Sequence, residues 1–549
     1  MRFAPGFGLR RRGSRLASRK KAGAHGKACG LQRGLSGQAS CDSDQGGHVR
    51  ARVRRRPGRD QGGLPEAVRV MGWSGSPERG IAMVVRCVAQ LCGLLLVLAA
   101  LVGCEYVRPT LNAPLGQWDP NYGYRFPNLA PAEEGNSDSL FIVAAFSGGG
   151  TRASTLSFGA LRELARQQIA WEGREKRLLD ELDVIYALSG GTCTAGYYAL
   201  FGERIFHDFE YRFLRKDWEK ELTERIVYSP RNWFRLWSPY FGRAYIMAEL
   251  LDEALFEGKT YGDLLSMKRR PGLLIHASDM AMLARFEFGP VQFDLICSDL
   301  SQFRIAHASA ASAALPLLLS PITLKNYAGT CGYEAPAWMK EASRSPRQGR
   351  RQRARELLSY LDANKRPNIH LLDGGLSDNM ALRGILEAGA VHGGLDALIK
   401  STGVKKVRKL VFLSVNAETS PDVHDFRSDE LPVMSKVFGS LVDIPINRYS
   451  SDTLLLMRLV IERLRAEWCA KPPGKDSAFT PDADLYFINV GLDAVEDKEE
   501  QDYLMKIPTS LHLTDEQIDR LLVAASRLIH RDPDFQRLMR DLEADGAVR

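Results

Sequence analysis

The sequence lacks the cysteine and histidine spacings that metal sites require. Its 549 residues include nine cysteines and ten histidines, but no Cys-x-x-Cys, His-x-x-x-His or His-Glu-x-x-His pattern. These spacings are typical of zinc sites. We therefore expect neither a metal nor a cofactor.

Cysteines are also too few to form a disulfide framework. Only four follow residue 104 in the remaining chain, and these are Cys193, Cys297, Cys331 and Cys469. An exported protein can still form one or two bridges from such a set. The sequence leaves their pairing open.

No apolar run is long enough to span a bilayer comfortably, which takes about twenty residues. The run that ends in Leu94–Val102 follows a single positive charge at Arg86 and is followed by Gly103 and Cys104. This arrangement predicts a secretory signal over residues 83–103. Leu101-Val-Gly-Cys104 also resembles a bacterial lipoprotein lipobox, which implies cleavage before Cys104 and attachment of lipid to it.

The chain before this signal is strongly basic. Residues 1–70 carry 17 Lys and Arg against 4 Asp and Glu, with many glycines and no apolar periodicity, which predicts disorder. The tract lacks the interleaved aromatic residues of a nucleic-acid-binding arm. We expect translation to begin at Met83 or Met71, so that residues 1–82 are absent from the mature protein. Without residues 1–103 the net charge changes from +8 to −6, and no nucleic-acid partner is expected.

Residues 104–138 predict an extended tether, because five prolines lie among Asn, Gly and Tyr. Glu105 follows Cys104, in place of the aspartate that resembles an inner-membrane retention signal. We expect a lipid-anchored protein of the bacterial cell envelope, in the outer membrane rather than the inner.

Two short apolar runs, each followed by glycines, indicate an acyl-transfer site. Phe141–Phe146 leads into Ser147-Gly-Gly-Gly-Thr-Arg152, and Leu182–Leu188 leads into Ser189-Gly-Gly191. Both runs read as buried parallel strands. The first loop offers backbone N–H groups for an oxyanion, and the second offers a serine on a sharp turn. The turn departs from Gly-x-Ser-x-Gly because Ala187 takes the place of the first glycine.

A third strand, residues 369–372, ends in Asp373-Gly374-Gly375. Reacting groups collect at the carboxyl ends of strands in open α/β sheets, so Asp373 can act as the base for Ser189. A Ser-His-Asp triad is the competing interpretation. The histidines available to such a triad are His392, His424, His512 and His530.

In this order the motifs resemble the patatin-like phospholipase family, and Ala308–Pro316 resembles the small-residue helix that precedes a proline in that family. The resemblance covers residues 139–420. It implies a three-layer α/β/α hydrolase fold like that of cytosolic phospholipase A2, with Ser189 and Asp373 as a catalytic dyad. Gly148, Gly149, Gly150 and Arg152 would form the oxyanion loop.

The resulting hypothesis is a serine-dependent lipid acyl hydrolase whose substrate is a membrane phospholipid or another acyl ester. The alternative is a catalytically silent lipid-binding or envelope-interaction lipoprotein on the same fold. Residues 421–549 are expected to form a C-terminal α/β extension packed on the core, in which Thr514 and Gln517 have capping-box spacing at the start of a helix.

Two insertions, about residues 200–265 and 326–366, interrupt the catalytic domain. Residues 231–245 of the first are dense in aromatic residues and arginine, which favours a well-packed helical subdomain, with a membrane surface or lid as the alternative. Residues 344–355 of the second contain six arginines, which favours a solvated loop before a helix at 356–361, with anionic headgroup binding as the alternative.

Overall fold

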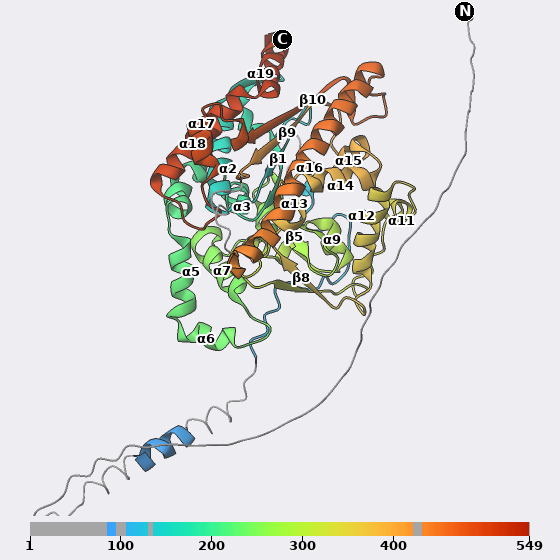
Figure 1. Ribbon diagram of the computed structural model, residues 1–549. Coiled ribbons are helices and arrows are strands. Elements are labelled where there is room, and N and C mark those ends of the chain that lie inside the picture. Colours follow the sequence, from blue (N-terminus) through green and yellow to red (C-terminus); the bar gives the residue numbers. More distant parts are fainter. Residues whose placement is uncertain (1–84, 95–105, 130–135, 421–430, 548–549) are drawn as a thin grey trace, which may run out of the picture. The chain divides into compact units, whose positions relative to one another are not determined.

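The computed structural model describes residues 85–94, 106–129, 136–420 and 431–547 (Figure 1). The chain divides into two compact units, Met1–Gly93 and Leu94–Arg549. Residues 85–94 are helical. The expected leader, Cys104 and all of the expected signal except these ten residues lie outside the described residues. Within the described ranges, no helix combines the length and the hydropathy that a membrane span needs.

An eight-stranded mixed sheet forms the centre of the second unit (Figure 1). Its order is β10-β9-β1-β4-β5-β8-β7, with β6 also paired to β5. The strands from β10 to β5 run parallel to one another, whereas the β5–β6, β5–β8 and β7–β8 pairs are antiparallel. The strand bounds are β1 Leu140–Phe146, β4 Leu182–Leu188, β5 Gly272–Asp279, β6 Ala284–Phe288, β7 Ile322–Lys325, β8 Asn368–Leu372, β9 Val407–Asn416 and β10 Phe479–Gly491.

Helices cover both faces of the sheet. Strand β1 is therefore buried on both sides. Its even-numbered residues, from Leu140 to Phe146, pack in one apolar core, and its odd-numbered residues, from Phe141 to Ala145, pack in another. The first core includes α2 Gly150–Arg166, α3 Gly191–Phe201, α7 Arg243–Leu251, α10 Ile305–Ser312, α18 Asp515–Arg531 and α19 Pro533–Ala547. The second includes α14 Arg383–His392, α15 Leu395–Ser401 and α16 Met434–Ala470. The expected three-layer α/β/α architecture is confirmed.

The remaining helices lie mainly in the two insertions. Those of the first are α4 Ile205–Phe209, α5 Trp218–Val227, α6 Pro230–Leu236, α7 and α8 Tyr261–Ser266, and those of the second are α11 Ala337–Ala342 and α12 Gln348–Leu358. Short α-helices α9 Pro290–Leu295, α13 Gly375–Asp378 and α17 Lys498–Met505 lie elsewhere in the second unit, and β2 Gln168–Trp171 pairs with β3 Arg174–Arg177.

The arginine-rich part of the second insertion is helical rather than a loop. Helix α12 begins at Gln348, eight residues before the expected position. Arg353 is buried and donates to the carbonyl of Arg285, and it pairs with Glu387 on α14. The groups that bind Arg353 on helix α12, Glu387 and the carbonyl of Arg285, are distant from it in sequence. The run of arginines alone therefore predicted a solvated loop.

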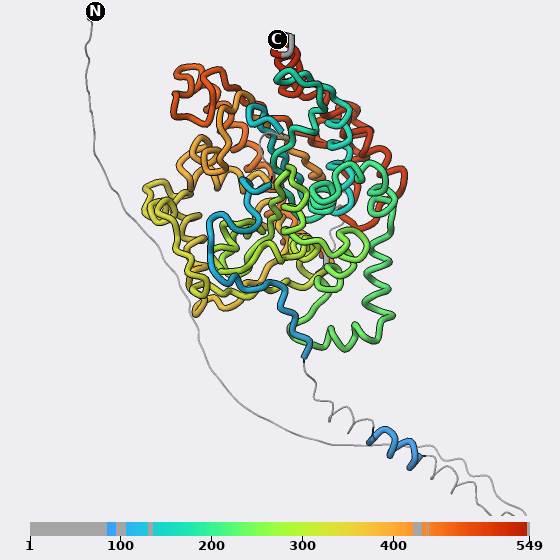
Figure 2. The backbone as a smooth tube through the Cα atoms, turned by 180° about the vertical axis from the view of Figure 1, so that it is seen from behind, coloured from blue at the N-terminus to red at the C-terminus, as the bar shows by residue number. Residues whose placement is uncertain are grey.

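The segment expected as a tether packs on the catalytic unit over residues 112–129. Leu115 donates its N–H to the carbonyl of Cys297 at 2.8 Å, and Arg125 pairs with Asp294 at 3.0 Å. Figure 2 shows this blue stretch of chain running along the back of the unit. The segment is extended, but its polar groups are bound to the sheet-bearing unit.

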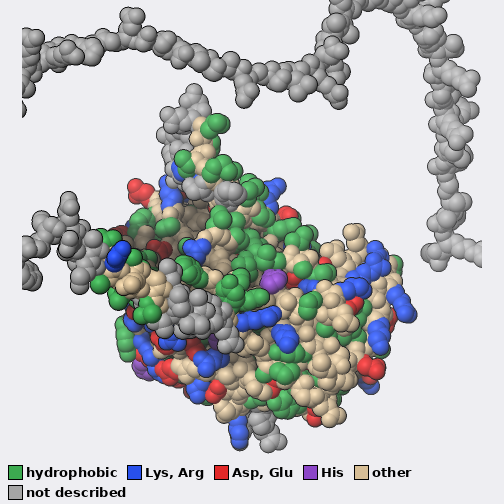
Figure 3. Space-filling model, turned by 90° about the horizontal axis from the view of Figure 1, so that it is seen from below, with side chains coloured by type: hydrophobic (Ala, Val, Ile, Leu, Met, Phe, Trp, Pro, Cys, Tyr) green, Lys and Arg blue, Asp and Glu red, His purple; other side chains and the backbone are tan. Residues whose placement is uncertain are grey.

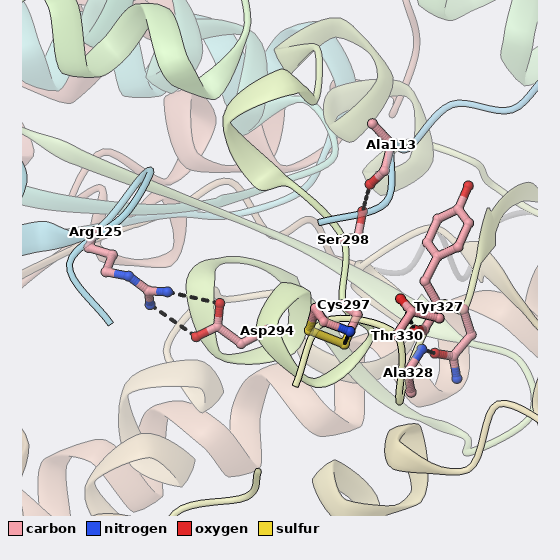
Figure 4. The surroundings of a disulfide bond; sticks show 10 residues. Ala113, Arg125, Asp294, Cys297, Ser298, Tyr327, Ala328 and Thr330 are labelled. Atoms are coloured by element: carbon pink, nitrogen blue, oxygen red, sulfur yellow. Dashed lines mark hydrogen bonds and ion pairs between the residues drawn. A yellow bond between two sulfur atoms is a disulfide. The ribbon is translucent and has the colours of Figure 1, made fainter. Parts of the chain in front are cut away.

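A disulfide joins Cys297 to Cys331 beside this segment (Figure 4). Trp118 donates its N–H to the carbonyl of Cys331, so both bridged residues hold the extended chain. A bridge that closes 34 residues contributes about 4 kcal/mol in the chain-entropy view. Cys193 is free and buried, and Cys469 is free and exposed.

The C-terminal residues complete the sheet and one of its layers. Strand β10 is paired along β9, and α18 packs against α2. Thr514 caps α18 as expected. Its side chain accepts from the Gln517 N–H, and the Gln517 side chain accepts from the Thr514 N–H. The central strands β9 and β1 therefore depend on residues beyond 420 for their burial.

Candidate active site

The serine turn lies between β4 and α3. Ser189 has φ of +44°, a left-handed conformation that costs energy for a residue with a side chain and is typical of a strained nucleophile turn. Its N–H donates to Ser312 Oγ at 2.7 Å, and Ser312 donates in turn to the carbonyl of His276. Ser189 is partly exposed.

Asp373 lies beside this serine, with Ser189 Oγ donating to Asp373 Oδ2 at 3.1 Å. Asp373 directly follows strand β8, which runs antiparallel to β5 and pairs only with the last two residues of β5, with Ser278 opposite Leu372. Strand β4 pairs with β5 in parallel, and Leu188 lies opposite His276. One further residue along each strand brings Ser189 and Asp373 to the same level of β5. The sheet thus joins two groups 184 residues apart through strands of opposite direction.

The environment of Asp373 suits a general base. The side chain is 5% exposed, and burial raises its pKa from 3.8 to about 6, although the N–H of Gly375 and the hydroxyl of Ser189 both favour the ionised form. Gly375 donates to Asp373 Oδ1 at 2.7 Å, which fixes the carboxylate plane and leaves Oδ2 for the serine. A carboxylate with this pKa is ionised at pH 7 and still accepts a proton readily.

The glycine loop packs directly on the serine turn. A Cβ at Gly190 would lie 2.0 Å from the carbonyl oxygen of Gly150, and one at Gly191 would lie 2.7 Å from that of Ser147. Gly149 and Gly150 have φ of +133° and +61°, values that favour glycine. Ala187 is different, because its side chain is fully buried in the core between neighbouring strands. The position therefore accommodates a methyl group.

The N–H groups of the loop are not equivalent. That of Gly148 donates to the carbonyl of Asn379 at 3.1 Å and is already occupied. Those of Gly149 and Gly150 donate to no residue in the described part of the chain, and α2 begins at Gly150. Two free donors at a helix N-terminus suit an oxyanion. Gly148 instead allows close approach, since a Cβ there would lie 2.5 Å from Asn379 Oδ1.

Arg152, the last residue of the expected oxyanion loop, makes its side-chain hydrogen bonds away from the catalytic pair. It is 2% exposed and donates to the carbonyls of Ala417 and Ile507 and to Thr509 Oγ1, at 2.8, 2.5 and 3.0 Å. No carboxylate among the described residues forms an ion pair with it, and burial lowers its pKa to about 10. Arg152 therefore ties the start of α2 to the C-terminal part of the chain.

The same C-terminal stretch touches the glycine loop through its backbone. Ser510 accepts the N–H of Thr151 at 2.9 Å, and a Cβ at Gly150 would lie 2.3 Å from the Ser510 carbonyl oxygen. Residues 507–510, which we call the C-terminal clamp, thus bound the oxyanion loop on one side. The sequence offered no local signal for this contact, because the two segments are more than 350 residues apart.

Among the described residues, none of the histidines proposed for a triad is a hydrogen-bond partner of Ser189 or Asp373. His392 stacks on Trp338 and contacts the Ala388 carbonyl, and His530 pairs with Glu163. His512 interacts through its backbone carbonyl, which accepts the Ser510 hydroxyl, and His424 lies outside the described residues. Among the described side chains, the only hydrogen-bond partner of Ser189 Oγ is Asp373.

Sequence reasoning missed three supporting residues. Ser312 and His276 hold the Ser189 backbone, and Asn379 accepts from Gly148 while its Nδ2 donates to Ser450 Oγ on α16 at 3.3 Å. Ser312 and Asn379 lie within the small-residue and Asp-Gly-Gly blocks, so their position beside known motifs was the available signal.

In the described ranges no three His, Cys, Asp or Glu side chains are grouped to hold a metal.

Comparison with known proteins agrees with this geometry. Residues 144–386 match the family model described as patatin-like phospholipase, a range that contains the glycine loop, the serine turn and Asp373. No curated protein matches the sequence.

Two solved structures show distant similarity. Human GIVD cytosolic phospholipase A2 is 12% identical with a TM-score of 0.42, and the match covers 75% of this chain and 63% of the human chain. VipD from Legionella pneumophila is 12% identical with a TM-score of 0.23, covering 71% and 67%. The chain thus spans less than two thirds of the human protein. By its family match, the protein carries a patatin-like phospholipase domain at residues 144–386.

Proposed function

We propose that the protein is a serine-dependent lipid acyl hydrolase of the phospholipase A or esterase type. The observation that carries the proposal is the hydrogen bond from Ser189 Oγ to the buried carboxylate of Asp373, next to two free backbone N–H groups. A nucleophile, a base with a pKa of about 6 and an oxyanion site then occupy one edge of the sheet.

The reaction follows from these positions. Asp373 removes the Ser189 proton as the serine oxygen attacks the ester carbonyl, and the negative oxygen is held by the N–H groups of Gly149 and Gly150. One such donor is worth roughly 3–4 kcal/mol in the transition state. The protonated Asp373 gives its proton to the leaving alcohol, and water then hydrolyses the acyl-serine by the same route.

Fatty-acid release from phospholipid vesicles, measured before and after treatment with an alkyl fluorophosphonate, tests the proposal. We expect release by the untreated full chain, complete loss after treatment, and one phosphonyl group on Ser189 by peptide mass mapping, because the reagent needs an activated serine and an oxyanion site. No release and no label would favour the catalytically silent lipid-binding alternative.

We also propose that the protein is anchored by lipid on Cys104 in the bacterial cell envelope, at the outer membrane. The lipobox-like Leu101–Cys104 and Glu105 support this proposal, as does the Cys297–Cys331 disulfide, since such bonds persist in oxidising compartments. Several acyl chains would hold the protein firmly at about 0.8 kcal/mol per buried methylene.

Metabolic labelling with radioactive palmitate tests the anchor in a bacterial host. We expect label in the wild-type chain and none in Cys104→Ala, with the label recovered in the outer-membrane fraction. Equal labelling of both chains would disprove attachment at Cys104.

A further inference from the structure

Helix α6 and the turn after it expose large aromatic side chains. Trp233, Phe234 and Trp237 are 53%, 75% and 84% exposed, and Tyr240 is 46% exposed. Trp233 Nε1 donates inward to the carbonyl of Val227 at 2.9 Å, so the exposed part of its ring is carbon. The expected well-packed subdomain is therefore wrong for this helix. Exposed apolar patches of a few hundred Å² mark interaction surfaces in soluble proteins.

The segment around these aromatic residues is rich in arginine: Arg225 pairs with Glu253 and Arg235 with Glu249, whereas Arg231 and Arg243 form no ion pair among the described residues. From Arg225 to Ala248 the sequence contains four arginines and neither Asp nor Glu. Arg231 is exposed and has no ion-pair partner among the described residues, and Arg243 donates to the backbone carbonyl of Leu317 at 2.6 Å. Aromatic side chains mixed with unpaired arginines suit the interface of an anionic bilayer.

Residues 107 and 108, near the start of the described part of the second unit, contact the turn after α6. Val107 accepts from the Ser238 hydroxyl at 2.7 Å, and the Arg108 guanidinium lies 4.6 Å from the centre of the Tyr240 ring. Figure 1 shows the blue N-terminal stretch reaching the unit beside α6. Val107 and Arg108, which follow Cys104 closely in sequence, thus contact the segment with exposed aromatic residues.

A short loop connects this surface to the catalytic pair. Asp373 donates its N–H to the carbonyl of Ala314, and three residues later Leu317 is 66% exposed and accepts from Arg243. Leu318 is 49% exposed. Figure 3 views the molecule from below, and its visible part shows hydrophobic side chains in green with Lys and Arg in blue among them.

From these observations we infer that α6, residues 237–243 and Leu317–Leu318 form a docking surface for an anionic phospholipid bilayer. The inference rests on the proposed function and extends it, because it brings the acyl-ester substrate to a surface that the Ala314–Leu318 loop links to Asp373. Binding itself does not depend on hydrolysis and is measured separately.

Vesicle flotation of the full chain tests the docking surface. All chains carry Cys104→Ala, which removes the proposed lipid, and Ser189→Ala, which prevents hydrolysis. The vesicles are phosphatidylcholine alone or equal parts phosphatidylcholine and phosphatidylglycerol. We expect Phe234→Ser/Trp237→Ser to weaken binding by at least about tenfold on both vesicles. Arg231→Gln should weaken it about fivefold on the anionic vesicles only.

Val523→Ser is the matched control, because it removes an apolar side chain that is 47% exposed on α18, which lies away from α6 in Figures 1 and 2. It should bind as the parent does. Equal binding by the Phe234/Trp237 variant and the parent would overturn the inference. So would sedimentation velocity showing that the aromatic face joins two copies of the chain, with vesicle binding unaffected by the variant.

Activity separates this inference from the proposed function. With Ser189 restored, the Phe234/Trp237 variant should lose at least about tenfold on vesicles and nothing on a soluble short-chain ester. If the parent hydrolysed neither substrate, the proposed function would fail while flotation still decided the docking surface.

Discussion

Ser189→Ala and Asp373→Asn are each expected to lower the rate of ester hydrolysis by about 10⁴-fold. Alanine removes the nucleophile, and asparagine cannot take the proton that Ser189 Oγ now shares with Asp373 Oδ2. Because the two groups act as a unit, the double variant should be no slower than either single one. The measurement is fatty-acid release and soluble-ester turnover by the full chain. Near-normal activity in Asp373→Asn would assign the base to another group.

The pH dependence should follow Asp373. Its pKa of about 6 predicts that kcat/KM falls tenfold per pH unit below 6 and becomes constant above about pH 7, since only the ionised carboxylate accepts the serine proton. A profile without an inflection near 6 would contradict this assignment.

The same ionisation lowers stability at neutral pH. Burial raises the folded-state pKa above the ordinary value of 3.8, so the folded state holds the proton more tightly and loses about 3 kcal/mol as pH rises from below 4 to above 6. Asp373→Asn removes this loss. We expect its Tm at pH 7.5 to be no lower than that of the wild type, which separates lost chemistry from misfolding.

Arg152→Met is expected to destabilise the fold by about 3–5 kcal/mol and to lower kcat by about 10²-fold. Methionine keeps much of the length of the side chain but leaves the carbonyls of Ala417 and Ile507 without their buried donor. The C-terminal clamp, residues 507–510, would then no longer fix the start of α2, where the N–H groups of Gly149 and Gly150 must face the oxyanion. Urea unfolding and soluble-ester kinetics measure the two effects.

Thr509→Val is the milder control for this prediction, because it removes only the contact with Arg152 Nη2. We expect a loss of about 1 kcal/mol and little change in kcat. If Arg152→Met lost stability but kept the wild-type kcat, the clamp would support the fold without positioning the oxyanion loop.

The sequence by itself determined the strands and turns that carry the chemistry. Short apolar runs before glycines predicted β1, β4 and β8 and the three turns that hold Gly148–Gly150, Ser189 and Asp373, because buried strands and tight turns leave strong local patterns. The capping-box spacing at Thr514 likewise marked the start of α18. These features depend on neighbouring residues and can be read without the fold.

Tertiary structure decided which of these groups act together. Pairing of β8 with only the carboxyl end of β5 sets Asp373 beside Ser189, and no local pattern reveals the direction or overlap of a strand. Arg152, expected as a member of the oxyanion loop, ties that loop to Ile507 and Thr509, and its partners could not be predicted because they lie in distant sequence. The exposure of Trp237 also depends on the tertiary structure, since an aromatic residue is buried only where other elements pack over it.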